Sequence, residues 1–349
     1  MSSGRTIQRY AAPCTPPWWA RSGHAQTIFA HVLPSAAPSV REHPRAQRRE
    51  IALDDGDRLV AFEIPGASGV RALLLHGLSG DIDSDYMRRA AQRLVARGHG
   101  VWAVNHRGCG DGAGLARKPY HSGRSDDLRT VLTASRALAP TLRHVVIGFS
   151  MSGNIALLHA AESDPLADAV LAINPVIDLA DASERISRGL SRLYELRFVR
   201  RLRADLRERQ RLGLIDARFA IRSSASLREF DEHITAPLGG FTGADDYYAR
   251  CSSRPRLAHV AKPAVIVAAA DDPFLDVGLY ANSKLSAQIT LHIEPHGGHI
   301  GFLGRGLERW IDGALEHYFE QLVSCFRSPS KMSLESAFLE RREDSRRPE

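Results

Sequence analysis

The stretch HVVIGFSMSGN, residues 144–154, joins a short apolar run to a segment that begins with small residues. Its first four residues suit a strand that is buried on both faces, and residues 151–162 have helical spacing. Gly148 and the small Ser152 allow the backbone to turn sharply between the two. Ser150 therefore lies at the tip of a strand-turn-helix, where a serine can be exposed as a nucleophile. A serine that caps a helix is the alternative interpretation.

The same alternation of apolar runs and helical spacing extends on both sides of this stretch. Further strands are predicted at 71–75, 100–105, 169–173, 264–269 and 289–293, and further helices at 84–97, 125–138 and about 306–326. Strands too apolar to face water, alternating with helices, indicate an α/β fold with a mostly parallel central sheet flanked by helices. Residues 49–64 differ, because their alternation around Asp55-Gly56 predicts an antiparallel hairpin.

The length and composition favour one domain with an insertion. The chain has 349 residues, of which 44% are hydrophobic and 25% charged, within the range of ordinary globular proteins. We expect an N-terminal arm at 1–48, an α/β domain at 49–326 and a disordered, charged tail at 327–349. Roughly ninety residues separate strands 169–173 and 264–269, more than one crossover helix needs, so we predict an inserted helical cap at about 178–258.

Charge and cysteine content restrict the partners and the compartment. The formal net charge of +6 is too mild to indicate nucleic-acid binding, and the arginine-rich segment 185–211 is better explained as a solvated helix face than as an anion site. The four cysteines lie far apart, without a C-x-x-C pair. No secretory leader or bilayer-length apolar run is found, so we expect a cytoplasmic protein without stable membrane insertion. The oligomeric state is not predicted.

A serine hydroxyl is a poor nucleophile at neutral pH, so it needs a base, an acid that orients this base, and donors for the oxyanion. Asp271 and Asp272 follow the predicted strand 264–269, which places a carboxylate at the carboxyl edge of the sheet. Either aspartate can orient a histidine. An Asx turn before Pro273 is the alternative interpretation.

Two histidines are candidates for the base. His296 and His299 both follow the predicted strand 289–293, and either completes the chain order serine, aspartate, histidine. Two glycines precede His299, so a flexible backbone can present its imidazole, and His299 is the favoured base. We interpret His296 as a loop residue.

The oxyanion donors are expected from the backbone. His76-Gly77-Leu78 ends the predicted strand 71–75, where a loop can offer an N–H group to the reacting carbonyl oxygen. The N–H groups of Leu78 and Met151 are the expected pair. His76 itself is as easily explained as a residue that shapes the loop.

Together these motifs resemble the YheT-like branch of the α/β-hydrolase superfamily, which is related to the animal ABHD lipid hydrolases. The likeness extends over most of residues 16–323. The matching segments are 22–27, 76–78, 83–84, 105–109, 120–123, 148–154, 271–274 and 297–302. The chain departs from the family pattern at Ser152, where glycine is usual, and at His106, where an aromatic residue is usual.

The resemblance implies an α/β-hydrolase fold and the hydrolysis of carboxylic esters, either short-chain or lipid-like, through an acyl-enzyme. It implies Asp272, the aspartate before Pro273, as the residue that orients His299. It also implies a small-molecule ester as the substrate, and no metal or organic cofactor. An acyltransferase or amidase that uses the same triad, and a non-catalytic binding protein of this fold, remain the alternatives.

Overall fold

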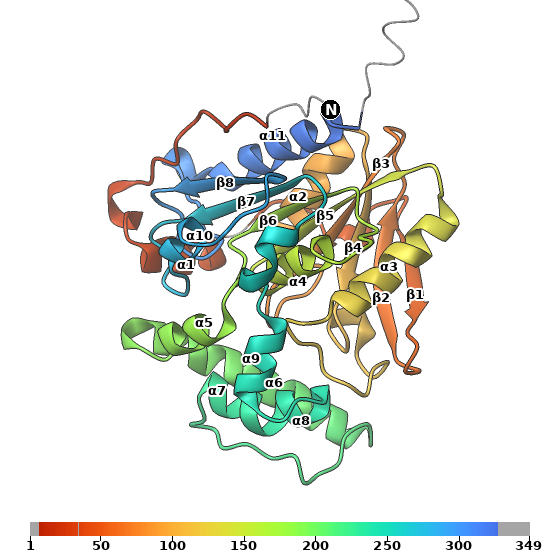
Figure 1. Cartoon of the computed structure of the whole chain (residues 1–349), viewed down its shortest axis with the longest axis vertical. Helices are drawn as coiled ribbons and strands as arrows, with labels where there is room; N and C mark the ends of the chain where they lie inside the picture. The colour runs from red at the N-terminus through yellow and green to blue at the C-terminus, as the bar shows by residue number, and fades with distance from the viewer. Residues whose placement is uncertain (1–6, 34, 327–349) are drawn as a thin grey trace, which may run out of the picture.

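The computed structural model describes residues 7–33 and 35–326, and the predicted tail at 327–349 lies outside this range. One eight-stranded sheet has the order β1-β2-β4-β3-β5-β6-β7-β8 (Figure 1). Its strands are β1 (Gln47–Ala52), β2 (Arg58–Ile64), β3 (Val70–Leu75), β4 (Gly100–Asn105), β5 (Arg143–Phe149), β6 (Ala169–Ile173), β7 (Ala264–Ala269) and β8 (Ile289–Glu294). β1 and β2 form the predicted hairpin, β2 pairs antiparallel with β4, and every other pair is parallel. The prediction of a mostly parallel sheet is confirmed.

Helices cover both faces of the sheet, as its apolar strands require. One face packs against α2 (Asp85–Ala96) and α11 (Trp310–Ser324). The other packs against α3 (Ser125–Leu138), α4 (Met151–Ala160) and α10 (Val277–Ala281). Among the described residues, no helix combines the length and the hydropathy that a bilayer-crossing segment needs.

The N-terminal arm packs beside the loop that follows β8. It contains the 3-10 turns η1 (Trp18–Ala20) and η2 (Val40–Glu42) and the helix α1 (Gly23–Val32). The buried Gln26 of α1 donates from Nε2 to the Leu303 carbonyl at 3.0 Å and accepts the Leu303 N–H at Oε1. These bonds tie α1 to the residues that precede the last helix.

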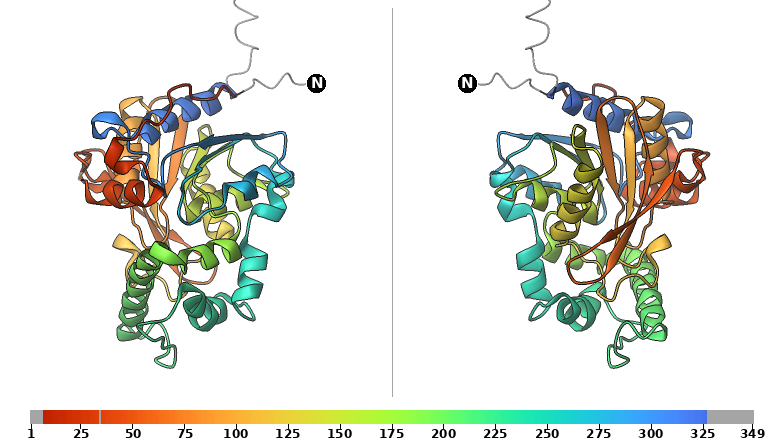
Figure 2. Two further views of the ribbon diagram at one scale, coloured as in Figure 1. Left: turned by 90° about the vertical axis from the view of Figure 1, so that its left-hand side faces the viewer. Right: turned by 90° about the vertical axis from the view of Figure 1, so that its right-hand side faces the viewer.

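A helical cap stands between β6 and β7, as predicted, and it lies beyond one end of the sheet (Figures 1 and 2). Its helices are α5 (Leu179–Ile186), α6 (Arg192–Arg211), α7 (Leu227–Phe230), α8 (Ala236–Gly239) and α9 (Ala244–Cys251). The short turns η4 (Gly189–Ser191), η5 (Asp231–Thr235) and η6 (Arg254–His259) join or follow them. The side chains of Leu206, Ile215, Phe230 and Ile234 form a separate small core within this cap.

Ser152 and His106, the two residues that depart from the family pattern, contact each other. Ser152, which is fully buried on α4, donates its hydroxyl to the His76 carbonyl, and His106 Nε2 lies 2.7 Å from the Ser152 hydroxyl oxygen. His76 Nδ1 donates to the Gly77 carbonyl at 2.8 Å, so its Nε2 accepts the His106 N–H at 3.2 Å. Burial lowers the pKa of His76 to about 4 and holds the pKa of His106 well below its ordinary value. Both rings are therefore neutral at pH 7, and the cluster ties the loops after β3 and β4 to the start of α4.

We expect Ser152→Gly to destabilise the protein, although glycine is usual in the family. The change removes the hydroxyl oxygen that accepts a hydrogen bond from the buried His106 Nε2–H. We therefore expect the free energy of unfolding to fall by about 1–2 kcal/mol. Urea denaturation of Ser152→Gly, His106→Phe and the double variant measures the coupling between the two sites. The double variant should lose less stability than the sum of the single losses. Additive losses would show that the two residues are independent.

Candidate active site

Ser150 occupies a backbone conformation that few residues other than glycine adopt. It joins β5 to α4 with φ 54° and ψ −118°. Its N–H donates to the Ile173 carbonyl at 2.8 Å, and its carbonyl accepts the Gly153 N–H at 2.9 Å. A Cβ atom at Gly148 would lie 2.2 Å from the Ser152 carbonyl oxygen, so only glycine fits there. The neighbours therefore hold Ser150 in a sharp turn at the carboxyl end of β5.

Three predicted residues meet at this turn. The Ser150 hydroxyl lies 2.7 Å from His299 Nε2, and His299 Nδ1 lies 2.8 Å from Asp272 Oδ2. The three residues follow β5, β7 and β8, whose parallel carboxyl ends lie at one edge of the sheet. All three are buried, so the hydrogen-bonded chain is sheltered from water.

The alternative residues Asp271 and His296 lie beside this chain and not within it. Asp271 Oδ1 accepts the N–H groups of Gly297 and Gly298 at 2.9 and 2.8 Å. His296 Nδ1 lies 3.6 Å from Asp271 Oδ2, and its side chain is 41% exposed. Burial raises the pKa of Asp271, and the two backbone donors oppose this rise. Asp271 thus supports the loop that carries His299.

Asp272 is held by two further groups. Its Oδ1 accepts the Phe274 N–H at 2.8 Å, so an Asx turn before Pro273 is also present. Asn174 Nδ2 donates to Asp272 Oδ2 and, at 2.9 Å, to the Gly298 carbonyl. Asn174 was not among the site residues predicted from the sequence. The sequence feature that could have indicated it is its position directly after β6, at the sheet edge where the other polar site residues lie.

A residue of the N-terminal arm helps to hold His299 in place. Thr27 Oγ1 on α1 accepts the His299 N–H at 2.9 Å, and the imidazole packs against Phe274 with ring centroids 4.6 Å apart. Gly298, just before His299, has φ 53°, and a Cβ atom there would lie 2.3 Å from the Gly23 carbonyl oxygen. Thr27 belongs to the matching segment 22–27, but the sequence alone did not indicate its partner.

The loop after β3 approaches Ser150 closely. A Cβ atom at Gly77 would lie 3.2 Å from Ser150 Cβ. Within the described part of the chain, the N–H groups of Leu78 and Met151 have no hydrogen-bond acceptor. The next residue, Ser79, has φ 58°, and two hydrogen bonds hold its backbone. Its N–H donates to Tyr120 Oη at 2.9 Å. Its carbonyl accepts from Arg201 Nη1 at 2.8 Å, so the cap contacts this loop directly.

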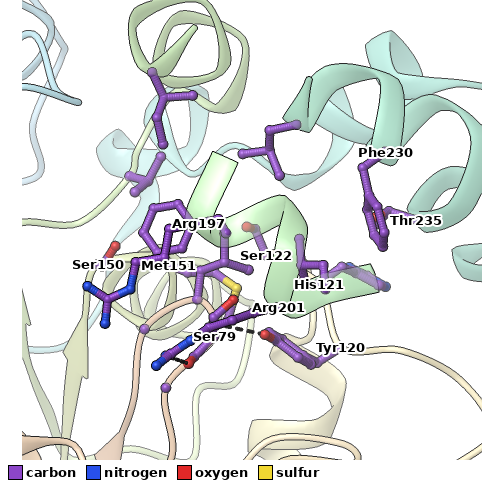
Figure 3. A pocket seen from close by; sticks show the side chains of 18 of the residues that line it. Ser79, Tyr120, His121, Ser122, Ser150, Met151, Arg197, Arg201, Phe230 and Thr235 are labelled. Carbon is purple, nitrogen blue, oxygen red and sulfur yellow. Dashed lines mark hydrogen bonds between the residues drawn. The ribbon is translucent and has the colours of Figure 1, made fainter. Parts of the chain in front are cut away.

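A cavity of about 480 Å³ between the cap and the edge of the sheet reaches Ser150 and His299. Figure 3 shows Ser150 and Met151 on one side of it and the cap residues Phe230 and Thr235 on another. Its lining is largely apolar, with Phe198, Leu202 and Ile234 among the contributing side chains. Over residues 7–33 and 35–326, no group of three or more His, Cys, Asp or Glu side chains is placed to hold a metal ion, and all four cysteines are free thiols.

Comparison with known proteins agrees with this architecture. The sequence profile of the family described as "alpha/beta hydrolase fold" matches residues 73–305. The YheT protein of Escherichia coli strain K12, named as a candidate esterase, is 30% identical over 306 residues, 84% of this chain and 88% of that protein. Human phospholipase ABHD3 is 24% identical, over 88% of this chain and 78% of its own length. A Pyrococcus furiosus esterase structure aligns at 17% identity with a TM-score of 0.57, over 90% of this chain and all of that chain, which shows the shared fold. The chain therefore belongs to the YheT-like, ABHD-related family of the α/β-hydrolases.

Proposed function

We propose that this protein is a serine hydrolase that cleaves carboxylic esters through an acyl-enzyme on Ser150, His299 and Asp272. The observation that carries the proposal is the continuous hydrogen-bonded chain from the Ser150 hydroxyl through the His299 ring to the Asp272 carboxylate. This chain opens onto a largely apolar cavity, which suits the acyl group of an ester. Relatives that are named as an esterase, a phospholipase and a monoacylglycerol lipase support the same class of reaction.

In the first half of the reaction, Ser150 Oγ attacks the ester carbonyl carbon while His299 Nε2 takes its proton. The carbonyl oxygen becomes an oxyanion, for which the N–H groups of Leu78 and Met151 are the proposed donors. The intermediate then collapses, the bond to the alcohol oxygen breaks, and His299 returns the proton to the leaving alcohol. Ser150 is left as an ester of the acyl group.

In the second half, water repeats these steps. His299 takes a proton from a water molecule that attacks the acyl-enzyme, and the second intermediate collapses to release the carboxylic acid and the Ser150 hydroxyl. Throughout, the carboxylate of Asp272 fixes the ring of His299 and stabilises the imidazolium that forms. Asn174 and Thr27 position these two residues without contact with the proposed reacting atoms.

Short-chain and lipid-like esters are the proposed substrates. The apolar residues of the cavity can accommodate the acyl chain of such an ester. We retain the cytoplasm as the proposed compartment, because free thiols such as those of this chain are ordinary in a reducing environment.

We expect Ser150→Ala to lower the turnover of p-nitrophenyl acetate and butyrate by at least about a thousandfold, because the acyl group then has no nucleophile. Ser122→Ala is the matched control, since Ser122 lines the same cavity and its bonds to Tyr247 and Asn154 use only its backbone. The control should retain most of its activity. If Ser150→Ala retained most of the turnover, the proposed nucleophile would be wrong. Product analysis with added alcohol separates hydrolysis from acyl transfer.

The two neighbouring aspartates should differ in their effect on kcat. Asp272→Asn removes the charge that faces the His299 ring, so we expect kcat to fall by about a thousandfold or more. Asp271→Asn keeps an oxygen that accepts the Gly297 and Gly298 N–H groups, so we expect a loss of about tenfold or less. Steady-state kinetics on p-nitrophenyl butyrate compare the two. Equal losses, or a larger loss at Asp271, would contradict the assignment of Asp272.

A further inference from the structure

Exposed apolar side chains concentrate in two segments of the surface. Nine large apolar side chains are exposed in the described part of the chain, and five of them lie on α1, on η4 and at the start of α6. We call these five the apolar rim: Ile28, Val32, Leu190, Leu193 and Leu196, with exposed fractions of 46%, 67%, 64%, 66% and 41%. Burying such side chains is favourable, so a cluster of them indicates a surface that another apolar phase covers.

The two segments of the rim lie next to each other, although about 160 residues separate them along the chain. The ring of His24 on α1 stacks on the ring of Tyr194 on α6, with centroids 5.8 Å apart and planes 4° apart. His24 Nδ1 also lies 3.3 Å from Tyr194 Oη. Figure 1 and the left view of Figure 2 show α1 and the start of α6 on the same side of the molecule.

The rim lies next to residues that line the cavity around Ser150. Thr27 and His31 of α1 line this cavity, and Ile28 and Val32 directly follow them in sequence. On α6 the exposed leucines precede the cavity-lining residues in sequence instead of following them. Tyr194 and Arg197 line the cavity, and Leu193 and Leu196 directly precede them. On both helices the exposed apolar side chains are therefore next in sequence to residues that line the cavity.

Exposed arginines follow the leucines along the same face of α6. Leu193, Leu196, Arg200 and Arg207 repeat at helical spacing and are all exposed, so they share one outer face. Six arginines of α6 form no ion pair within the described residues, whereas Arg209 pairs with Asp205 and Arg211 pairs with Glu208. The six are Arg192, Arg197, Arg200, Arg201, Arg203 and Arg207.

We propose that the apolar rim and the outer face of α6 dock the protein on an anionic lipid surface. An exposed helix face with leucines at one end and unpaired arginines along it has the chemistry of a segment that lies in a membrane interface. The leucines would enter the headgroup region, and Arg200 and Arg207 would face the lipid phosphates. A nucleic acid would match the arginines but would leave the five apolar side chains without a partner.

The docking surface contains none of the proposed catalytic residues, so lipid binding can be tested independently of the role of Ser150. One consequence does rest on the proposed function. With the rim in the interface, the side of the cavity that α1 and α6 line lies next to the lipid. An ester with a long acyl chain then reaches Ser150 without exposing that chain to water.

Flotation with lipid vesicles tests the docking surface. Wild-type protein is mixed with vesicles of phosphatidylcholine alone and of phosphatidylcholine with 30% phosphatidylglycerol, at low and high salt. We expect binding to the anionic vesicles at least about tenfold tighter than to the neutral ones, and weaker at high salt. Leu193→Gln/Leu196→Gln and Arg200→Gln/Arg207→Gln should each weaken binding to anionic vesicles by about tenfold or more.

Matched controls exist elsewhere on the surface. Leu138→Gln changes a leucine that is 57% exposed at the end of α3, away from the rim, and Arg45→Gln/Arg256→Gln removes two other exposed arginines. Both controls should bind as the wild type does. The rim and α6 variants should keep wild-type turnover of soluble p-nitrophenyl butyrate, because the changed side chains do not line the cavity.

Three results would overturn the proposal. They are the absence of binding to anionic vesicles, equal binding by the wild type and the Leu193→Gln/Leu196→Gln variant, and equal weakening by the controls. Sedimentation without vesicles adds a fourth outcome. A dimer that the rim variant dissociates, with no vesicle binding, would assign the rim to a second copy of the chain.

Discussion

The backbone of Ser150 is the constraint on which the site depends. A residue with a side chain pays a conformational penalty at φ 54° and ψ −118°, so the surrounding structure must hold it there. Gly148 allows the chain to pass close to the Ser152 carbonyl, and the Ile173 carbonyl binds the Ser150 N–H. The same turn starts α4 and leaves the Met151 N–H without an acceptor among the described residues. One strained residue thus positions both the hydroxyl and a candidate oxyanion donor.

Around this turn, support comes from parts of the chain that are distant in sequence. Thr27 from the arm fixes the His299 backbone, and Asn174 after β6 fixes the Asp272 carboxylate. The cap joins the loop after β3 through the hydrogen bond from Arg201 to the Ser79 carbonyl. A movement of α6 would therefore reach the loop that carries the Leu78 N–H, which links access to the cavity with the geometry of the site.

The elements that sequence could predict are those with strong periodicity. The six strands predicted from apolar runs all occur, with ends within about two residues, because burial on both faces dictates their composition. The last helix starts at Trp310 and not near 306, because Gly306 adopts φ 66° in a separate turn. Ser150 could be selected because it follows a strand, whereas Asp272 was chosen over Asp271 by the family resemblance and His299 over His296 by the glycines before it; their catalytic roles remain proposals. The pairing of Ser152 with His106, and the support from Asn174 and Thr27, could not be predicted, since they arise from contacts between segments that only the fold brings together.

The proposed reaction depends on Ser150 as a nucleophile that His299 activates. Its most direct test is to treat the protein with a fluorophosphonate and locate the adduct by peptide mass spectrometry. We expect one adduct, on Ser150, formed at a rate that falls by orders of magnitude in His299→Ala, because the roughly thousandfold advantage of a general base is then lost. An adduct on another serine, or no adduct on the folded wild-type protein, would contradict it.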